Sequence, residues 1–348
     1  MEGPGLRAEL SRKYYVRSRT ARTAALRIAY IAYARTVAGW QLRRPTAEAR
    51  ASLRRRIEEL FERDWQDAND GFYPRDLIDG LPWREYALAA PKLIADLPKT
   101  RERIRSRRHD ELPDQAAERY PRYYARNFHY QTDGYLGHTS AELYDLQVEL
   151  IFGGTADVMR RRLVPPVVRF ARAQGYDAGR PMKLLDVACG TGHLLRMLGK
   201  ALPDARLFGL DLSPQYIARA RETLPREMEV SLVCDDAEKL PFVDGHFDAA
   251  TNLYLLHEVP RDVRSRVLGE MFRVLRPGGL AVVADSLQFG DAPELSRELR
   301  AFPERFHEPY YEEYAAQDLA GVVAAAGFTV RETTLAFLTK IVVAEKPS

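Results

Sequence analysis

Two short segments pair histidine with glutamate and lie among aromatic residues, a combination suited to proton transfer. They are His257-Glu258 and His307-Glu308, and His129 lies in a separate tyrosine-rich stretch. Because histidine can remove a proton near neutral pH, we expect His257, Glu258, His307 and His129 to be candidate catalytic residues. For any one of them the alternative is an ordinary hydrogen-bonded loop residue. We predict no metal site, since the pairs lack the His-x-x-x-His spacing of a helical zinc site.

A glycine-rich loop follows the first strongly apolar segment of the second half of the chain. Residues 183–188 are predicted to form a buried strand, and Cys189-Gly190-Thr191-Gly192 leads from it into a helix at 193–201. Glycines let the backbone approach a ligand closely, and parallel sheets bind ligands where their strands end. A dinucleotide would require a third glycine where Leu195 stands, and Asp186 would repel a pyrophosphate. The loop therefore favours an adenosyl sulfonium over NAD.

The order of apolar segments predicts an α/β fold in the second half of the chain. Strands and helices alternate after residue 181, and two β-like stretches at 329–334 and 337–343 are expected to pair antiparallel. This alternation is typical of a doubly wound, mostly parallel sheet. The first half is helical and Arg-rich, with a loop or hairpin predicted at 67–91. We expect a helical domain at 1–120, a helical cap or linker at 121–180 and the cofactor domain at 181–348.

Four segments in order resemble the class I S-adenosylmethionine-dependent methyltransferases, particularly the branch of the ubiquinone and menaquinone methyltransferases. They are 184–192, 210–213, 235–242 and 247–252, followed by the Arg-Pro-Gly-Gly of 276–279. The resemblance implies a seven-stranded methyltransferase sheet and S-adenosyl-L-methionine as the cofactor. It also implies that Asp211 binds the ribose hydroxyls and that Asp236 binds the adenine amino group. The expected cofactor-binding residues are Asp186, Ala188, Gly190, Thr191, Gly192, Asp211, Leu212, Asp236, Ala237, Asn252 and Tyr254.

The methyl acceptor is expected to be a small, aromatic, quinone-like or lipophilic molecule, methylated at oxygen or carbon. Aromatic residues are dense at 120–144 and 302–314, which suits a flat or hydrophobic ligand. Enzymes that methylate exocyclic amines of nucleic acid bases tend to carry an Asn/Asp-Pro-Pro-Tyr/Phe tetrad after the fourth strand. Here that position reads Asn252-Leu-Tyr-Leu255, without proline. The segment argues against base methylation.

The distribution of charge leaves a second function open. The chain has 348 residues and a net charge of +3, but Lys and Arg are concentrated in its first half. A basic half is compatible with nucleic acid, so the alternative is a nucleic-acid-directed methyltransferase or binding protein. The basic helices of 16–40 could instead contact a membrane surface. A further alternative is a protein that has the methyltransferase fold but serves only as a binding or regulatory module. Two cysteines and no secretory signal favour a cytoplasmic protein.

Overall fold

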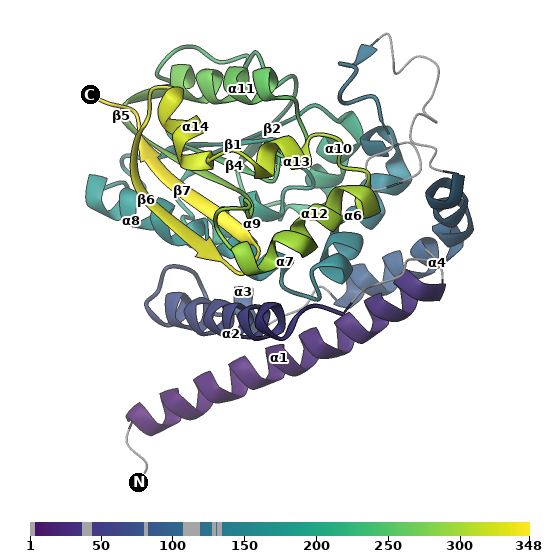
Figure 1. The fold of residues 1–348 in the computed structure, drawn as a ribbon. Helices are drawn as coiled ribbons and strands as arrows, with labels where there is room; N and C mark the ends of the chain where they lie inside the picture. Colours follow the sequence, from purple (N-terminus) through teal and green to yellow (C-terminus); the bar gives the residue numbers. More distant parts are fainter. Residues whose placement is uncertain (1–3, 37–43, 80–82, 107–118, 127–129, 131–133) are drawn as a thin grey trace.

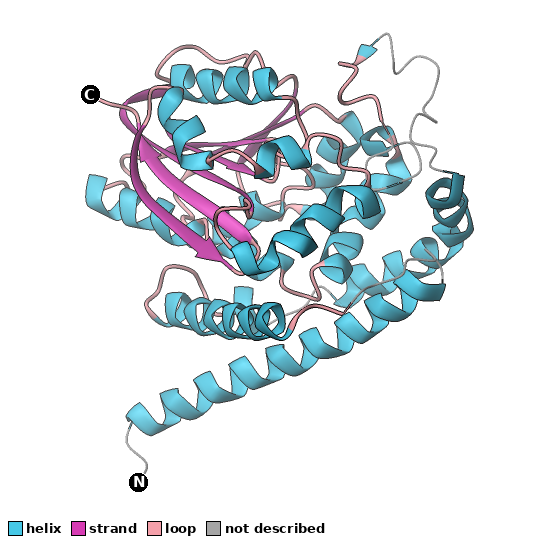
Figure 2. Ribbon diagram, in the orientation of Figure 1, coloured by secondary structure: helices cyan, strands magenta, loops and turns pink. Residues whose placement is uncertain are grey.

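A seven-stranded sheet forms the centre of the molecule (Figures 1 and 2). The computed structural model describes residues 4–36, 44–79, 83–106, 119–126, 130 and 134–348. The strand order is β3-β2-β1-β4-β5-β7-β6, and β7 runs antiparallel to both of its neighbours. The strands are β1 Lys183–Val187, β2 Arg206–Asp211, β3 Val230–Cys234, β4 Phe247–Leu253, β5 Leu275–Ser286, β6 Thr329–Ala336 and β7 Thr339–Glu345.

Helices cover both faces of this sheet, because consecutive residues of its central strands point to opposite sides. Leu184 of β1 packs with α8 (Val164–Gln174), α9 (His193–Ala201) and α10 (Pro214–Thr223). Leu185 packs with α11 (Arg261–Val274) and α14 (Leu319–Ala325) on the other side. The predicted doubly wound, mostly parallel sheet is therefore confirmed. Between β5 and β6 lie η3 Pro293–Leu295, α12 Ser296–Phe306 and α13 Tyr311–Ala315 as well.

The first half of the described chain is helical and packs against one face of the sheet. Thr46 caps α2 by accepting a hydrogen bond from the Ala49 amide at 3.0 Å. Ile57, Leu60 and Phe61 form a buried apolar stripe on α2 and join the cluster that contains Leu184. The domain boundaries proposed from the sequence stay a prediction. The helices are α1 Pro4–Thr36, α2 Ala47–Asn69, α3 Asp76–Asp79, α4 Trp83–Ser106, α6 His138–Ile151 and α7 Ala156–Arg161, with η2 Gly134–Leu136 before α6.

The prediction of a loop or hairpin at 67–91 is wrong over most of that stretch. The structure has α3 there and the first part of α4, which continues past Pro91 to Ser106. The sequence signal was the cluster of glycine and proline, which usually ends a helix. Packing outweighs that signal, because Ala89 of α4 lies in a buried cluster with Leu143 and Leu146 of α6.

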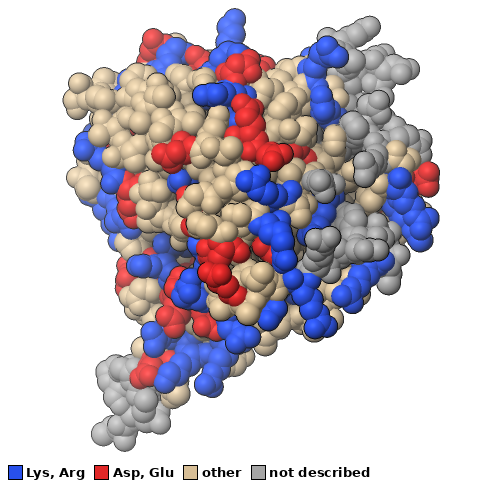
Figure 3. All heavy atoms as spheres, in the orientation of Figure 1, with Lys and Arg blue, Asp and Glu red and all other residues tan. Residues whose placement is uncertain are grey.

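Charged side chains of both signs are interspersed over the face of the molecule seen in Figure 3. On the described part of that face, no broad field of a single sign is visible. Within the described ranges, none of the helices combines the length and apolarity needed to span a bilayer.

Candidate active site

The loop after β1 turns sharply through backbone conformations that favour glycine. Ala188 has φ +59°, Gly190 +56° and Gly192 +81°. A Cβ on Gly192 would lie 3.3 Å from side-chain atoms of Ala220 and Leu224, so glycine at this position also lets α10 pack closely. Because positive φ costs a non-glycine residue about 1–3 kcal/mol, Ala188 indicates a backbone that its surroundings hold in place.

Asp211, the last residue of β2, fixes this loop from the neighbouring strand. Its Oδ2 accepts a hydrogen bond from the Gly190 amide and its Oδ1 one from the Ser213 amide, both at 2.9 Å. Each carboxylate oxygen has two lone pairs, so Asp211 keeps acceptor capacity for a ligand hydroxyl. Burial raises the pKa of Asp211 to about 6, against the lowering effect of these amide hydrogen bonds.

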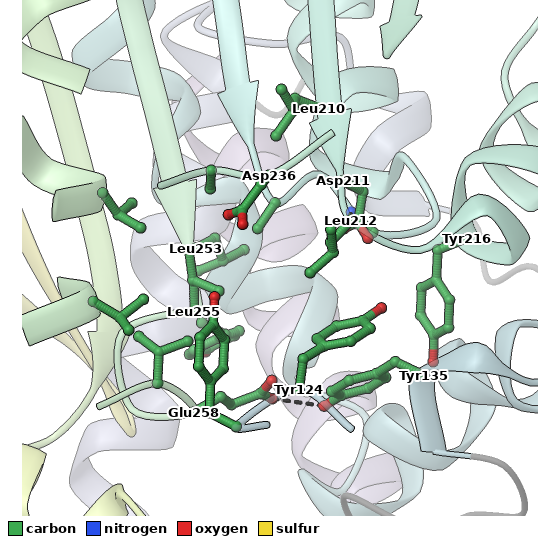
Figure 4. Close-up of a pocket in the computed structure, with 18 of the residues that line it drawn as sticks. Tyr124, Tyr135, Leu210, Asp211, Leu212, Tyr216, Asp236, Leu253, Leu255 and Glu258 are labelled. Atoms are coloured by element: carbon green, nitrogen blue, oxygen red, sulfur yellow. Dashed lines mark hydrogen bonds between the residues drawn. The ribbon is translucent and has the colours of Figure 1, made fainter. Parts of the chain in front are cut away.

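The carboxyl ends of the strands open into one pocket (Figure 4). Figure 4 shows Asp211 and Asp236 on one side of the pocket and Glu258 on the other, beside the hydroxyl of Tyr135. Of the cofactor-binding residues expected from the sequence, those on the pocket wall are Ala188, Gly190, Asp211, Leu212, Asp236, Ala237 and Tyr254. Among the described residues that form the wall, none is a lysine, arginine or histidine. A wall with three carboxylates and no cation does not suit a pyrophosphate.

The other expected cofactor residues lie under or beside the loop and shape it. Asp186 is buried and accepts a hydrogen bond from the Thr251 hydroxyl at 2.7 Å. Burial and the charge of Asp211 raise the pKa of Asp186 to about 7. Asn252 donates from Nδ2 to the carbonyl of Val187 at 2.9 Å, which ties the end of β4 to the end of β1. Separately, Thr191 donates to Asp145 at 2.9 Å, and Gly192 contacts α10.

Tyrosines that the sequence analysis did not assign to the site form much of its wall. Tyr124, Tyr135 and Tyr144 precede the sheet, and Tyr216 comes from α10. Burial raises the pKa of each of these phenols, so they remain neutral hydrogen-bond donors. Tyr135 donates to Glu258 Oε1 at 2.7 Å. The aromatic density at 120–144, which predicted a site for a flat ligand, includes Tyr124, Tyr135 and Tyr144, whereas Tyr216 lies outside that stretch.

His257 lies just beyond β4, buried and bound to Asp285 at the end of β5. Its Nδ1 is 2.5 Å from Asp285 Oδ1, and the amides of Leu256 and His257 donate to Asp285 Oδ2 at 2.8 and 3.2 Å. Burial alone would lower the pKa of His257, but Asp285, Glu308 and Glu258 raise it to about 10. An imidazolium with both ring nitrogens protonated has no lone pair left to accept a proton, so the raised pKa argues against His257 as the general base.

The remaining predicted catalytic residues lie in different places. Glu258 is on the pocket wall. His307 ends α12 at φ +54° and its ring lies 5.8 Å from that of Tyr130, away from the pocket wall. His129 falls outside the residues that the structure describes. The structure also brings Glu308 to His257 and Glu258, with one potential ligand atom of each within 4.8 Å of the others.

Comparison with known proteins identifies the family. Residues 184–279 match the family described as methyltransferase domain. A demethylmenaquinone methyltransferase of Thermus thermophilus is 32% identical over 226 residues, which are 57% of this chain and 93% of that protein. The chain belongs to the class I S-adenosylmethionine-dependent methyltransferases.

Two further relatives match this methyltransferase over shorter lengths. A ubiquinone/menaquinone biosynthesis C-methyltransferase of Desulfotalea psychrophila is 39% identical over 118 residues, covering 34% of this chain and 46% of that protein. An O-methyltransferase of Penicillium expansum is 34% identical over 185 residues, covering 52% of this chain and 62% of that protein. The chain thus spans less than two thirds of the length of both of these relatives.

The pocket fits S-adenosylmethionine by the chemistry of its donors and acceptors. Asp211 has lone pairs left for ribose hydroxyls, and Asp236 lies beside the apolar side chains of Leu212 and Ala237. Carboxylates around the pocket favour a ligand with a positive charge, as the sulfonium has. The chain is therefore a methyltransferase that uses S-adenosylmethionine.

Proposed function

We propose that the methyl acceptor is a small hydroxylated aromatic molecule of the quinol type, methylated at oxygen or at a ring carbon. The observation that carries this proposal is the group of tyrosines that line the same pocket as Asp211, Asp236 and Glu258. Aromatic side chains bind flat rings by stacking or by edge-to-face contact. Tyr135, Tyr144 and Tyr216 already make edge-to-face contacts with one another, at centroid distances of 5.4 to 6.2 Å.

The residues of this chain have distinct tasks in such a transfer. Bound S-adenosylmethionine supplies a methyl group on a cationic sulfur. Asp211 and the glycine loop orient the cofactor, and the tyrosine wall holds the acceptor ring against it. Glu258 faces the pocket from the acceptor side and takes a hydrogen bond from Tyr135. The relative from Thermus thermophilus is named for demethylmenaquinone and the relative from Penicillium expansum for methylation at oxygen, which supports a quinol-type acceptor.

A panel of acceptors tests this proposal. The purified chain is incubated with S-adenosylmethionine carrying a deuterated methyl group and, in turn, with a short-chain demethylmenaquinol, a catechol, an aliphatic amine or RNA. We expect the label in one of the hydroxylated aromatic rings, detected by mass spectrometry, and S-adenosylhomocysteine in equal amount. The Asp211→Asn variant should lose most of this turnover. Methylation of the amine or of RNA alone would overturn the proposal.

A further inference from the structure

The segment after β4 and the segment after α12 bring three ligand-type side chains to one point. His257 and Glu258 belong to the first segment and Glu308 to the second. One side-chain atom of each lies within 4.8 Å of the others, and His257 Nε2 is 3.9 Å from Glu258 Oε1. His257 and Glu308 are buried, with 6% and 1% of their surface exposed. Buried carboxylates close to one another are costly unless a proton or a cation compensates them.

Asp285 fixes the orientation of the imidazole in this group. The Nδ1 side of the ring is bound to Asp285, itself fully buried at the end of β5, and the Nε2 side is directed toward Glu258. Histidines that ligate metals commonly have their second ring nitrogen bound to a carboxylate in this way, which sets the tautomer and the ring orientation. The group therefore contains both a set of ligand atoms and the outer carboxylate that such a site needs.

Against the prediction from sequence spacing, we propose that His257, Glu258 and Glu308 bind one divalent transition-metal ion at the acceptor end of the methyltransferase pocket, which displaces the Nε2 proton of His257 to solvent. An imidazole with two carboxylates suits zinc, manganese or iron, whereas magnesium and calcium prefer oxygen ligands alone. Metal–ligand bonds of about 2.0–2.2 Å place ligand atoms roughly 3 to 4 Å apart. Side-chain rotations that bring these atoms, now within 4.8 Å of one another, to that spacing would complete the site.

The site leaves coordination positions open toward the pocket. Three protein ligands are typical of catalytic rather than structural metal sites, whose further positions take water or substrate. Glu258 lies on the pocket wall and is held by Tyr135, so an ion beside it faces the acceptor space (Figure 4). This inference rests on the proposed function in one respect, because the acceptor must carry a hydroxyl oxygen.

The ion would bind the acceptor hydroxyl and promote loss of its proton to water. For methylation at oxygen, the lone pair of that oxygen forms the new bond to the methyl carbon. The electron pair of the broken carbon–sulfur bond stays on sulfur, which becomes the neutral thioether of S-adenosylhomocysteine. The site thus selects acceptors that offer an oxygen to a divalent cation.

Metal titration of the full chain tests the site. Protein freed of metal with EDTA is titrated with Zn²⁺ or Mn²⁺ by calorimetry, with Mg²⁺ as the comparison. We expect one site per chain for the transition metals and at least tenfold weaker binding of Mg²⁺. Glu258→Gln and Glu308→Gln should each weaken binding of Zn²⁺ or Mn²⁺ by about 10- to 100-fold.

The matched control is Glu312→Gln, which alters an exposed glutamate of α13 four positions after Glu308. It should bind metal like the native chain. Circular dichroism and the affinity of Glu308→Gln for S-adenosylhomocysteine check that the variant is folded. The proposal is overturned if the native chain does not bind metal at one site per chain. It is also overturned if Glu258→Gln and Glu308→Gln both bind metal as tightly as the native chain.

Acceptor methylation measured with EDTA separates the two proposals. If an aromatic acceptor is methylated by a chain that binds no metal, the metal site is wrong and the proposed function stands. If metal binds at one site per chain and no hydroxylated aromatic is methylated, the proposed acceptor class is wrong and the metal site stands.

Discussion

Arg161 of α7 donates two hydrogen bonds to the carboxylate of Asp64 in α2, from Nε at 2.8 Å and from Nη2 at 2.7 Å. Both side chains are buried, and the hydroxyls of Tyr15 and Tyr73 donate to the same carboxylate. Burial would raise the pKa of Asp64, but Arg161 and these hydroxyls hold it below its usual value. One carboxylate therefore joins α1, α2 and the turn after α2 to α7.

Asp64→Ala should destabilise the protein by about 3–5 kcal/mol, because it leaves the Arg161 guanidinium buried without a counter-charge. Urea unfolding followed by circular dichroism measures the loss. Glu59→Ala is the matched control on the same helix, since the Glu59 side chain is 66% exposed. It should change the free energy of unfolding by about 0.5 kcal/mol or less. Equal losses in the two variants would show that the ion pair does not hold these helices.

Asp211→Asn should weaken binding of S-adenosylhomocysteine by roughly 10- to 100-fold, since a hydrogen bond to a charged group contributes about 1.5–3 kcal/mol. The variant loses the carboxylate that is predicted to bind the ribose and that accepts the hydrogen bond of the Gly190 amide. Isothermal titration calorimetry measures the affinity. Asp204→Asn, an exposed position in the turn before β2, is the control and should bind like the native chain. Unchanged affinity in Asp211→Asn would contradict the ribose assignment.

The affinity for the cofactor product should also fall as the pH drops through about 6. Burial raises the pKa of Asp211 to about 6, so the carboxylate is ionised at pH 7.5 and largely protonated at pH 5. The protonated form is a poorer acceptor for ribose hydroxyls. Titrations with S-adenosylhomocysteine between pH 5 and 7.5 measure how the affinity changes with pH. In Asp211→Asn the affinity should change less over this range. The same slope in the variant would assign the pH dependence to another group.

Most helices and strands could be predicted from the sequence because local sequence signals determine where they begin and end. Ser213 caps α10 and Pro214 begins it, a common start signal of a helix, and the helix at 193–201 has the predicted bounds. The strand ends also placed Ala188, Asp211 and Asp236 on one pocket. These residues follow neighbouring parallel strands, so the topology alone brings them together.

Contacts between distant segments could not be read in the same way. His257-Glu258 and His307-Glu308 lie 50 positions apart, and only the packing of the segment after α12 brings Glu308 to the first pair. The same limit applies to Tyr135, whose bond to Glu258 spans 123 positions. Neither pairing has a periodicity or a spacing that a single sequence could reveal. The loop predicted at 67–91 failed for a related reason, since contacts with α6 stabilise the start of α4.

His193 should make the stability of the protein depend on pH on the alkaline side. It begins α9 and lies between Asp145, 3.2 Å from its Nε2, and Asp157, 3.3 Å from its Nδ1. Burial alone would lower the pKa of His193, but the two carboxylates raise it to about 9, against 6.5 for an unperturbed histidine. A raised pKa in the folded state gives stability that is fully present below pH 6.5 and lost as the pH rises through 9. The contribution is at most about 3 kcal/mol.

Urea unfolding at pH 6.5, 8 and 9.5 measures this loss, and His193→Gln should flatten part of the decline. Some slope should remain in the variant, because His257 has a raised pKa and contributes with the same sign. His138→Gln is the matched control, since the His138 side chain on α6 is 71% exposed. It should keep the full slope of the native chain. A native-like decline in His193→Gln would show that the contacts of His193 with Asp145 and Asp157 do not stabilise its charged form.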